Sequence, residues 1–90
     1  MTPNEKETLL EFPCEFTVKA MGLDSEDFQD LAEAIVSRHL EEGAALSSHT
    51  NNSRNRKYLS VSVTFTAHSK QQLDAIYMDL TSEPRVLVAL

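Results

Sequence analysis

The side chains of this chain that could act as nucleophiles or bases are few, and they stand apart from one another. Cys14 lies between Pro13 and Glu15, so no neighbouring base or cation would stabilise its thiolate. The acidic pair Glu41 and Glu42 lies where a predicted helix ends in solvent, which is a poor setting for acid–base catalysis. The sequence therefore predicts no catalytic group, and Cys14 is expected to be a small, largely buried thiol at the start of a strand.

The three histidines do not form a metal-binding pattern. His39, His49 and His68 fall at a predicted helix end, on a weak strand and at a strand-to-helix junction. Metal ligation would require such side chains to converge, and nothing in their spacing favours that. We expect no metal site and no cofactor, and we expect His39 to interact with the negative end of the helix.

Positive charge is concentrated in one short segment, which contains Arg54, Arg56 and Lys57 and no acidic residue. The whole chain carries a net charge of −6, and both predicted helices carry acidic residues. A negative chain is poorly suited to nucleic acids, because binding without sequence preference depends on neutralising phosphates. The basic segment is therefore either a solvated loop or a local contact for an anion or a protein partner.

Arg54 and the amides near it form the only candidate cluster for a small hydrolase that acts on acyl or phosphoryl compounds. These amides belong to Asn51, Asn52 and Asn55. Ordinary turn composition explains the same residues better, because asparagine is favoured in hairpin loops. We therefore expect that the chain is not an enzyme.

The spacing of hydrophobic residues predicts the helices and strands that carry these residues, because it changes between strand-like and helix-like periods along the chain. The order along the chain is strand, helix, strand, strand, helix, strand. The predicted ranges are 16–21, 25–40, 46–51, 58–67, 70–81 and 85–90. This order is typical of the split βαβ pattern and predicts an α+β, ferredoxin-like βαββαβ fold.

Length and composition are those of one small domain. The chain has 90 residues, of which 41% are hydrophobic and 24% are charged. We expect a flexible polar tail over residues 1–8 and a single ferredoxin-like domain over residues 9–90. The single cysteine fits a reducing compartment, and neither a leader peptide nor a membrane span is recognisable, so we expect a cytoplasmic protein that does not bind membranes.

The predicted sheet has one covered face and one open face. Two helices with one apolar stripe each can cover a single face, and right-handed crossovers lead to a four-stranded antiparallel sheet of order 4-1-3-2. Alternation along the strand over residues 58–67 directs Phe65 into the core and Ser62 to the open face. Because the open face lacks stacking aromatic residues, RNA recognition of the usual kind is not expected.

Several residues at characteristic spacing resemble the YbeD-like family of small bacterial proteins. They are Glu11-Phe12-Pro13, Phe16, Lys19 and Met21-Gly22, followed by Tyr58, Ser60-Val61 and a final aliphatic run. The resemblance implies a ferredoxin-like fold similar to regulatory ACT domains, no established enzymatic activity and a link to lipoate metabolism. Where that family usually holds a glycine, the segment 53–57 has none, so we expect Asn55 to take the left-handed conformation.

The first function expected of such a module is regulation or protein interaction without catalysis. The final predicted strand is apolar on both faces. Its alternation would direct Val86, Val88 and Leu90 to the helices and Leu87 and Ala89 to the open face. An apolar edge strand associates unless something covers it, and the cover would be a second copy of the chain or the segment 9–12 folded back. Leu87 and Ala89 are therefore predicted interface residues of a homodimer or of a complex with another protein.

The second expected function is that of a sensor for a small anionic metabolite or amino acid on the open face. Lys19 on a central strand would bind the anion, with Thr17 and Thr64 beside it. A cation at such a position is costly unless it is exposed or paired. The ordinary alternative is a solvated Lys19 paired with Glu15 or a neighbour.

Overall fold

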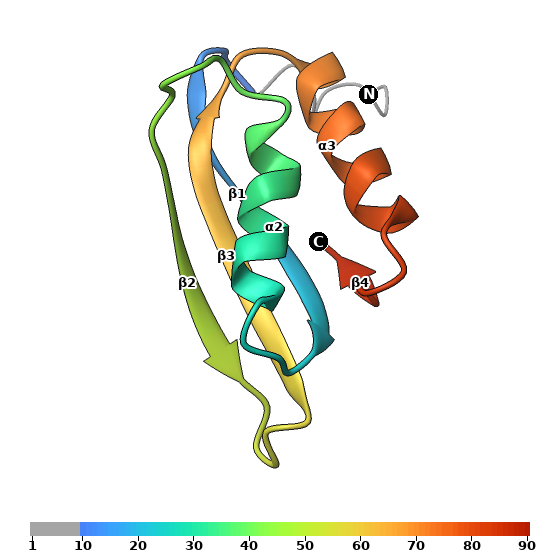
Figure 1. Cartoon of the computed structure of the whole chain (residues 1–90). Helices are drawn as coiled ribbons and strands as arrows, with labels where there is room; N and C mark the ends of the chain where they lie inside the picture. Colours follow the sequence, from blue (N-terminus) through green and yellow to red (C-terminus); the bar gives the residue numbers. More distant parts are fainter. Residues whose placement is uncertain (1–9) are drawn as a thin grey trace, which may run out of the picture.

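The computed structural model describes residues 10–90, which form one four-stranded antiparallel sheet with two helices on one of its faces (Figure 1). The strands are β1 (Cys14–Leu23), β2 (Leu46–Asn52), β3 (Tyr58–Ala67) and β4 (Val88–Ala89), and the helices are α2 (Phe28–Ser37) and α3 (Lys70–Ser82). The order β2-β3-β1-β4 confirms the predicted ferredoxin-like fold. The tail expected over residues 1–8 lies outside the described residues.

The strands β1 and β3 form the centre of the sheet, because each alternates apolar and polar residues along its length. Their register pairs Val18 with Val63 on the core face and Lys19 with Ser62 on the open face. Val18 and Val63 each expose only 1% of their surface, and Phe65 is buried as predicted. The period of two residues therefore assigns the faces of both central strands.

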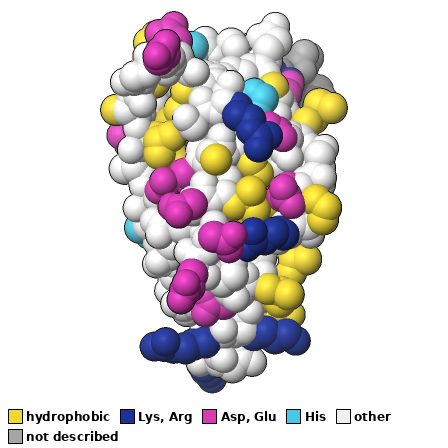
Figure 2. All heavy atoms as spheres, viewed as in Figure 1, with side chains coloured by type: hydrophobic (Ala, Val, Ile, Leu, Met, Phe, Trp, Pro, Cys, Tyr) yellow, Lys and Arg dark blue, Asp and Glu magenta, His cyan; other side chains and the backbone are white. Residues whose placement is uncertain are grey.

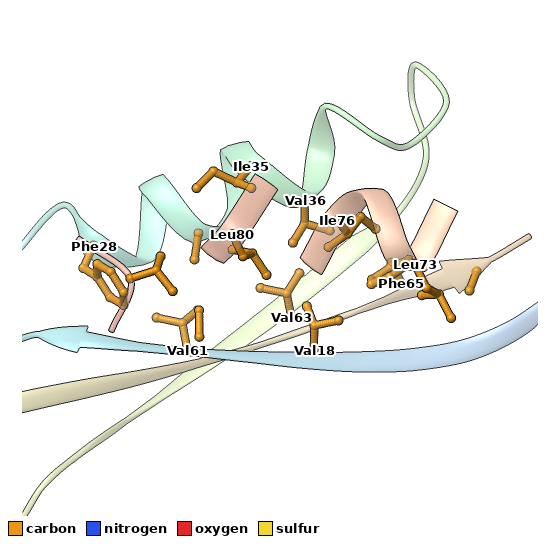
Figure 3. Packing of buried hydrophobic residues seen from close by; sticks show 14 of the residues in the cluster. Val18, Phe28, Ile35, Val36, Val61, Val63, Phe65, Leu73, Ile76 and Leu80 are labelled. Carbon is orange, nitrogen blue, oxygen red and sulfur yellow. The ribbon is translucent and has the colours of Figure 1, made fainter. Parts of the chain in front are cut away.

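The core lies between this sheet and the two helices, as Figure 3 shows. The helices contribute Phe28, Ile35 and Val36 from α2 and Leu73, Ile76 and Leu80 from α3, and the sheet contributes Val18, Val61, Val63 and Phe65. Burial of one such side chain stabilises the fold by about 1.5–3 kcal/mol. The opposite face of the sheet has no such cover among the described residues.

The helix α2 begins at Phe28, three residues later than predicted, and it ends at Ser37. Its N-cap residue, Asp27, makes no side-chain cap hydrogen bond. The reason is a competing partner, because Ser25 and Asp27 both hydrogen-bond to the guanidinium of Arg85. Neither α2 nor α3, the helices of the described residues, is long and apolar enough to cross a membrane.

The helix α3 begins where the sequence predicts. Its N-cap is Ser69, whose hydroxyl accepts a hydrogen bond of 3.0 Å from the Gln72 backbone N–H. The Gln72 carboxamide oxygen accepts from the backbone N–H of His68 at 2.7 Å. These two hydrogen bonds form a capping box, although the second bond goes to the residue before the cap.

The strand β4 is shorter than predicted, and its side chains point to the opposite faces from those expected. Ala89 is the register partner of the buried Ala20 and packs against the core. Val88 is the register partner of Met21, which lies on the open face. The prediction that Ala89 projects onto the open face and Val88 onto the helices is therefore wrong.

The physical cause is an irregularity at the start of β4. The Leu87 N–H donates a hydrogen bond of 2.7 Å to the Met21 carbonyl, although the register partner of Met21 is Val88. Two residues thus lie opposite one, as in a β-bulge, and the alternation shifts by one residue. Lys19 and Leu90 then exchange two backbone hydrogen bonds of 2.8 Å, which places Leu90 beside Lys19 on the open face.

Candidate functional site

Exposed apolar side chains gather where β1 and β4 meet at the open face. Of the six exposed large hydrophobic residues in 10–90, four lie here: Leu23, Leu87, Val88 and Leu90, with exposed fractions of 57%, 54%, 43% and 67%. Met21 lies among them and is half-buried. We call these five residues the apolar edge. The sequence indicated this site through Leu87, but it assigned Ala89 to it in place of Val88 and Leu90.

A small hollow lies at one end of the apolar edge. It has a volume of about 230 Å³ and is lined by Leu23, Ser25, Pro84, Arg85 and Leu87. Three of these five residues are apolar, and Ser25 and Arg85 are the polar ones. A hollow of this size accommodates a side chain of another protein rather than a cofactor.

The rest of the open face is polar. The hydroxyl oxygens of Thr17 and Thr64 lie 2.8 Å apart and share a hydrogen bond. Lys19 lies two residues along β1 from Thr17, on the same face, and opposite Ser62. The structure therefore brings together Thr17, Lys19 and Thr64 as predicted, but each threonine hydroxyl has the other as its partner.

The environment of Lys19 differs from a formed anion site. Its ammonium forms no ion pair with any of residues 10–90, and the suggested pair with Glu15 is not formed. Thr64 and Glu15 line a shallow cavity of about 210 Å³, and Lys19 is not part of its lining. An anion at Lys19 would therefore be held on an exposed surface, where charge pairing contributes little.

The basic segment forms the tip of the hairpin between β2 and β3. The prediction for its backbone is wrong in one respect, because Arg56, and not Asn55, has a positive φ of 60°. The Asn55 carboxamide oxygen accepts hydrogen bonds from the Ser53 hydroxyl at 3.1 Å and from the Lys57 N–H at 3.2 Å. This Asx-type pairing fixes the turn around Asn55 and leaves the left-handed position to the next residue.

The hydrolase cluster considered from the sequence does not assemble at this tip. The Asn52 amide donates to the Asp24 carboxylate at 3.2 Å, and the Asn55 amide serves the turn itself. Neither amide hydrogen-bonds to Arg54 within the described part of the chain. The Asn52 amide nitrogen and the Asn55 carboxamide oxygen thus have partners other than Arg54.

One charged cluster was not foreseen. Arg85 donates to both carboxylate oxygens of Asp27, at 2.7 and 3.0 Å, and to the Ser25 hydroxyl at 2.7 Å. These hydrogen bonds, Arg85 first and Ser25 second, lower the pKa of Asp27 to about 2. The two ends of the pair are 58 residues apart, so local spacing contains no signal for it.

A second cluster joins the segment after α2 to α3 and involves one of the histidines. The His39 ring nitrogen Nε2 lies 2.9 Å from the Asp79 carboxylate, and Arg38 lies 3.3 Å from the same group. The pKa of Asp79 is lowered, chiefly by the hydrogen bond with His39.

No group of three or more His, Cys, Asp or Glu side chains within residues 10–90 is placed to hold a metal ion. Cys14 is half-buried and packs against the core.

Comparison with known proteins identifies relatives along nearly the whole chain. Residues 7–90 match a family described as "Protein of unknown function (DUF493)". A UPF0250 protein of Chromobacterium violaceum is 37% identical over 97% of this chain and 98% of its own length. A UPF0250 protein of Hahella chejuensis is 35% identical over 100% of both chains. The solution structure of HP0495 from H. pylori has the same fold, with a TM-score of 0.77 over 100% of this chain and 94% of that one, at 14% identity.

Proposed function

The chain belongs to the DUF493 family of small bacterial proteins, and we propose that it is a non-enzymatic interaction module whose partner at the apolar edge is a second copy of itself. The observation that supports this proposal is the gathering of four exposed large hydrophobic residues at one margin of the sheet. Single apolar side chains on a surface are ordinary, whereas a contiguous group indicates a contact with another molecule.

The backbone of β4 suggests how the second copy would approach. Lys19 and Leu90 direct their N–H and carbonyl groups toward each other. Because the groups of an antiparallel strand alternate in direction, those of Ala89 point away from β1, to the outer edge. An antiparallel pairing of β4 with its equivalent, centred on Ala89, would place Val88 of one copy beside Leu90 of the other. Such cross-strand apolar pairs contribute about 0.2–1 kcal/mol each.

Charge favours the same approach. In Figure 2, which is viewed from the helix side, acidic side chains are spread over α2, and hydrophobic side chains gather beside β4. The five residues of the apolar edge carry no charge, whereas the chain as a whole carries −6. Two copies that meet through α2 would bring like charges together, and two copies that meet through the apolar edge would not.

Sedimentation equilibrium between 5 and 500 µM tests this proposal. We expect the wild-type protein to dimerise, and we expect Val88→Lys to shift it to a monomer. Ala89→Pro should also weaken the dimer, because it removes only a backbone donor that points outward. The matched control is Thr50→Lys on β2, the other edge of the sheet, and it should leave the mass unchanged. A wild-type protein that is monomeric throughout this range would contradict the proposal.

A second candidate function is a sensor for a small anionic metabolite, and the unpaired state of Lys19 within residues 10–90 favours it. Thermal-shift measurements with lipoate, amino acids and small dicarboxylates provide the test. A ligand present at 100 times its Kd should stabilise the fold by about 2.7 kcal/mol. The shift should vanish in Lys19→Ala and persist in Lys70→Ala. If no compound shifts the wild-type protein, the sensor function is excluded for this set of ligands.

A further inference from the structure

The tip of the β2–β3 hairpin, residues 53–57, carries the densest positive charge of the molecule. Arg54, Arg56 and Lys57 are all exposed there. The sequence contains no acidic residue between Glu42 and Asp74, so the hairpin has no acid of its own. The hairpin extends past both helices in Figure 1, and Lys and Arg side chains mark the same end of the molecule in Figure 2. The tip is thus a positively charged protrusion (Figure 1) on a protein whose net charge is negative.

The tip cations differ from most other cations of the described chain in having no carboxylate partner. Three cations elsewhere form ion pairs: Arg38 with Asp79 at 3.3 Å, Lys70 with Asp74 at 3.1 Å and Arg85 with Asp27 at 2.7 Å. None of the three tip cations forms an ion pair with any of residues 10–90. The Lys57 ammonium lies 5.4 Å from the centre of the Tyr58 ring, which holds that side chain in place and leaves its charge unneutralised.

The backbone of the tip is ordered without help from the three cationic side chains. The Ser53 N–H donates to the Tyr58 carbonyl at 3.0 Å, and the Arg56 N–H donates to the Ser53 carbonyl at 2.9 Å. The Ser53 hydroxyl accepts from the Tyr58 N–H at 3.0 Å and donates to the Asn55 carboxamide oxygen. The charges therefore stand on a turn that needs little further ordering when it binds, and this lowers the entropic cost of association.

The backbone conformation of Arg56 indicates that its side chain has a role other than stabilising the fold. A residue with a β-carbon at a φ of 60° is strained, and glycine or asparagine usually takes such a position. Arginine brings no conformational advantage there. Strained residues of this kind concentrate at functional sites, where the side chain serves a purpose other than stability.

We propose that this hairpin tip docks onto a carboxylate-rich segment of another protein. Carboxylates match the guanidinium groups of Arg54 and Arg56 in charge and in hydrogen-bond geometry. The cavity beside the tip, of about 200 Å³, is lined in part by Asn51, Asn52 and Tyr58 and by none of the three cations. This cavity would therefore not hold a free small anion against the three cations. The protruding tip (Figure 1) instead presents its cations to an extended segment of another protein.

The remaining charges of the chain distinguish a protein partner from a nucleic acid. A nucleic acid spans many phosphates, and it would meet the net charge of −6 beyond the tip. A short acidic segment needs only the three local cations. This contact is separate from the apolar edge, since it uses the turn between β2 and β3 rather than the margin at β4.

The experiment is a titration of the full-length ¹⁵N-labelled protein with a ten-residue polyglutamate peptide, followed by amide chemical shifts. In 20 mM salt we expect shifts confined to residues 53–58, and 300 mM salt should weaken them because exposed charges are screened. Arg54→Gln/Lys57→Gln should reduce the affinity about fivefold or more, as expected for the loss of two exposed ion pairs. The control Arg38→Gln/Lys70→Gln removes the same charge at exposed positions outside the tip and should change the affinity less than twofold.

Four outcomes would overturn the proposal. The first is an absence of shifts at residues 53–58 with millimolar peptide, and the second is an equal loss of affinity in the control variant. The third is tighter binding at the same residues by a single-stranded DNA of ten nucleotides or, at equal total charge, by inorganic phosphate. The fourth is a dependence of the tip resonances on protein concentration without peptide, which would identify a second copy as the occupant.

Discussion

The ring of Phe28 closes directly over the backbone of Gly22. A β-carbon at residue 22 would lie 2.7 Å from ring atoms Cε1 and Cζ and 2.4 Å from the backbone carbonyl oxygen of Arg85. Such distances leave no room for a methyl group, and one of the two obstacles is backbone. The first turn of α2, the strand β1 and the segment that leads to β4 thus meet at one glycine.

This contact predicts that Gly22→Ala is strongly destabilising. We expect a loss of about 3 kcal/mol in the free energy of unfolding, because the surrounding atoms are backbone and a buried ring. Gly43→Ala serves as the control. Gly43 has a φ of 81° and no atom within 4 Å of an added β-carbon, so its cost of about 1 kcal/mol should be conformational. Urea unfolding of both variants provides the measurement, and equal losses would contradict the contact at Gly22.

The strained arginine predicts a variant that gains stability. Arg56→Gly should stabilise the protein by about 1 kcal/mol, because glycine adopts a positive φ without penalty. The neighbouring Arg54 is not in the left-handed region, so Arg54→Gly should destabilise by about 0.5–1 kcal/mol. Thermal unfolding of the two variants gives the comparison. A loss of stability in Arg56→Gly would show that the side chain of Arg56 has a structural role.

The pair between Asp27 and Arg85 predicts a pH dependence. The pKa of Asp27 is lowered from its ordinary value of 3.8 to about 2, so the native state holds this carboxylate ionised more strongly than the unfolded state does. Its stabilising contribution is complete above about pH 4 and is lost as the pH falls toward 2. Asp27→Asn should therefore be less stable than the wild-type protein at pH 6, and this difference should shrink between pH 4 and pH 2.

Urea unfolding at pH 6, 4, 3 and 2 measures this difference. The control is Asp30→Asn, in the first turn of the same helix, because Asp30 forms no ion pair within residues 10–90. The difference in free energy of unfolding between Asp30→Asn and the wild-type protein should vary less with pH than the difference for Asp27→Asn. A constant difference for Asp27→Asn from pH 6 to pH 2 would show that the ion pair does not stabilise the fold.

The carboxamide of Gln72 connects the start of α3 to the segment after α2, and it predicts a specific loss. Its oxygen accepts from the His68 N–H at 2.7 Å, and its nitrogen donates to the His39 carbonyl at 2.9 Å. Gln72→Ala should cost about 1–2 kcal/mol, since two hydrogen bonds are lost and the one to the His39 carbonyl is partly shielded from water. Gln71→Ala, at an exposed position on the same helix, should change stability by less than about 0.5 kcal/mol. Similar values for both variants would contradict a structural role of this bridge.

Part of the candidate site followed from the sequence alone. The placement of Thr17, Lys19 and Thr64 on one face was predicted correctly, because alternation along β1 and β3 is continuous over ten residues in each strand. The apolar edge was predicted only through Leu87. The final strand is short, and one bulged residue is enough to exchange its two faces.

The sequence by itself determined the order of the elements and the core faces of β1, β3 and the helices, since hydrophobic burial acts on every repeat of a long pattern and one exception changes little. Only the tertiary structure decided the face of Ala89, the pairing of Arg85 with Asp27 and the left-handed conformation of Arg56. Each of these depends on one or a few specific contacts rather than on a repeated pattern. Such contacts are set by residues that are distant in the chain or by a shift of one residue in strand register. The local sequence pattern contains no information about either.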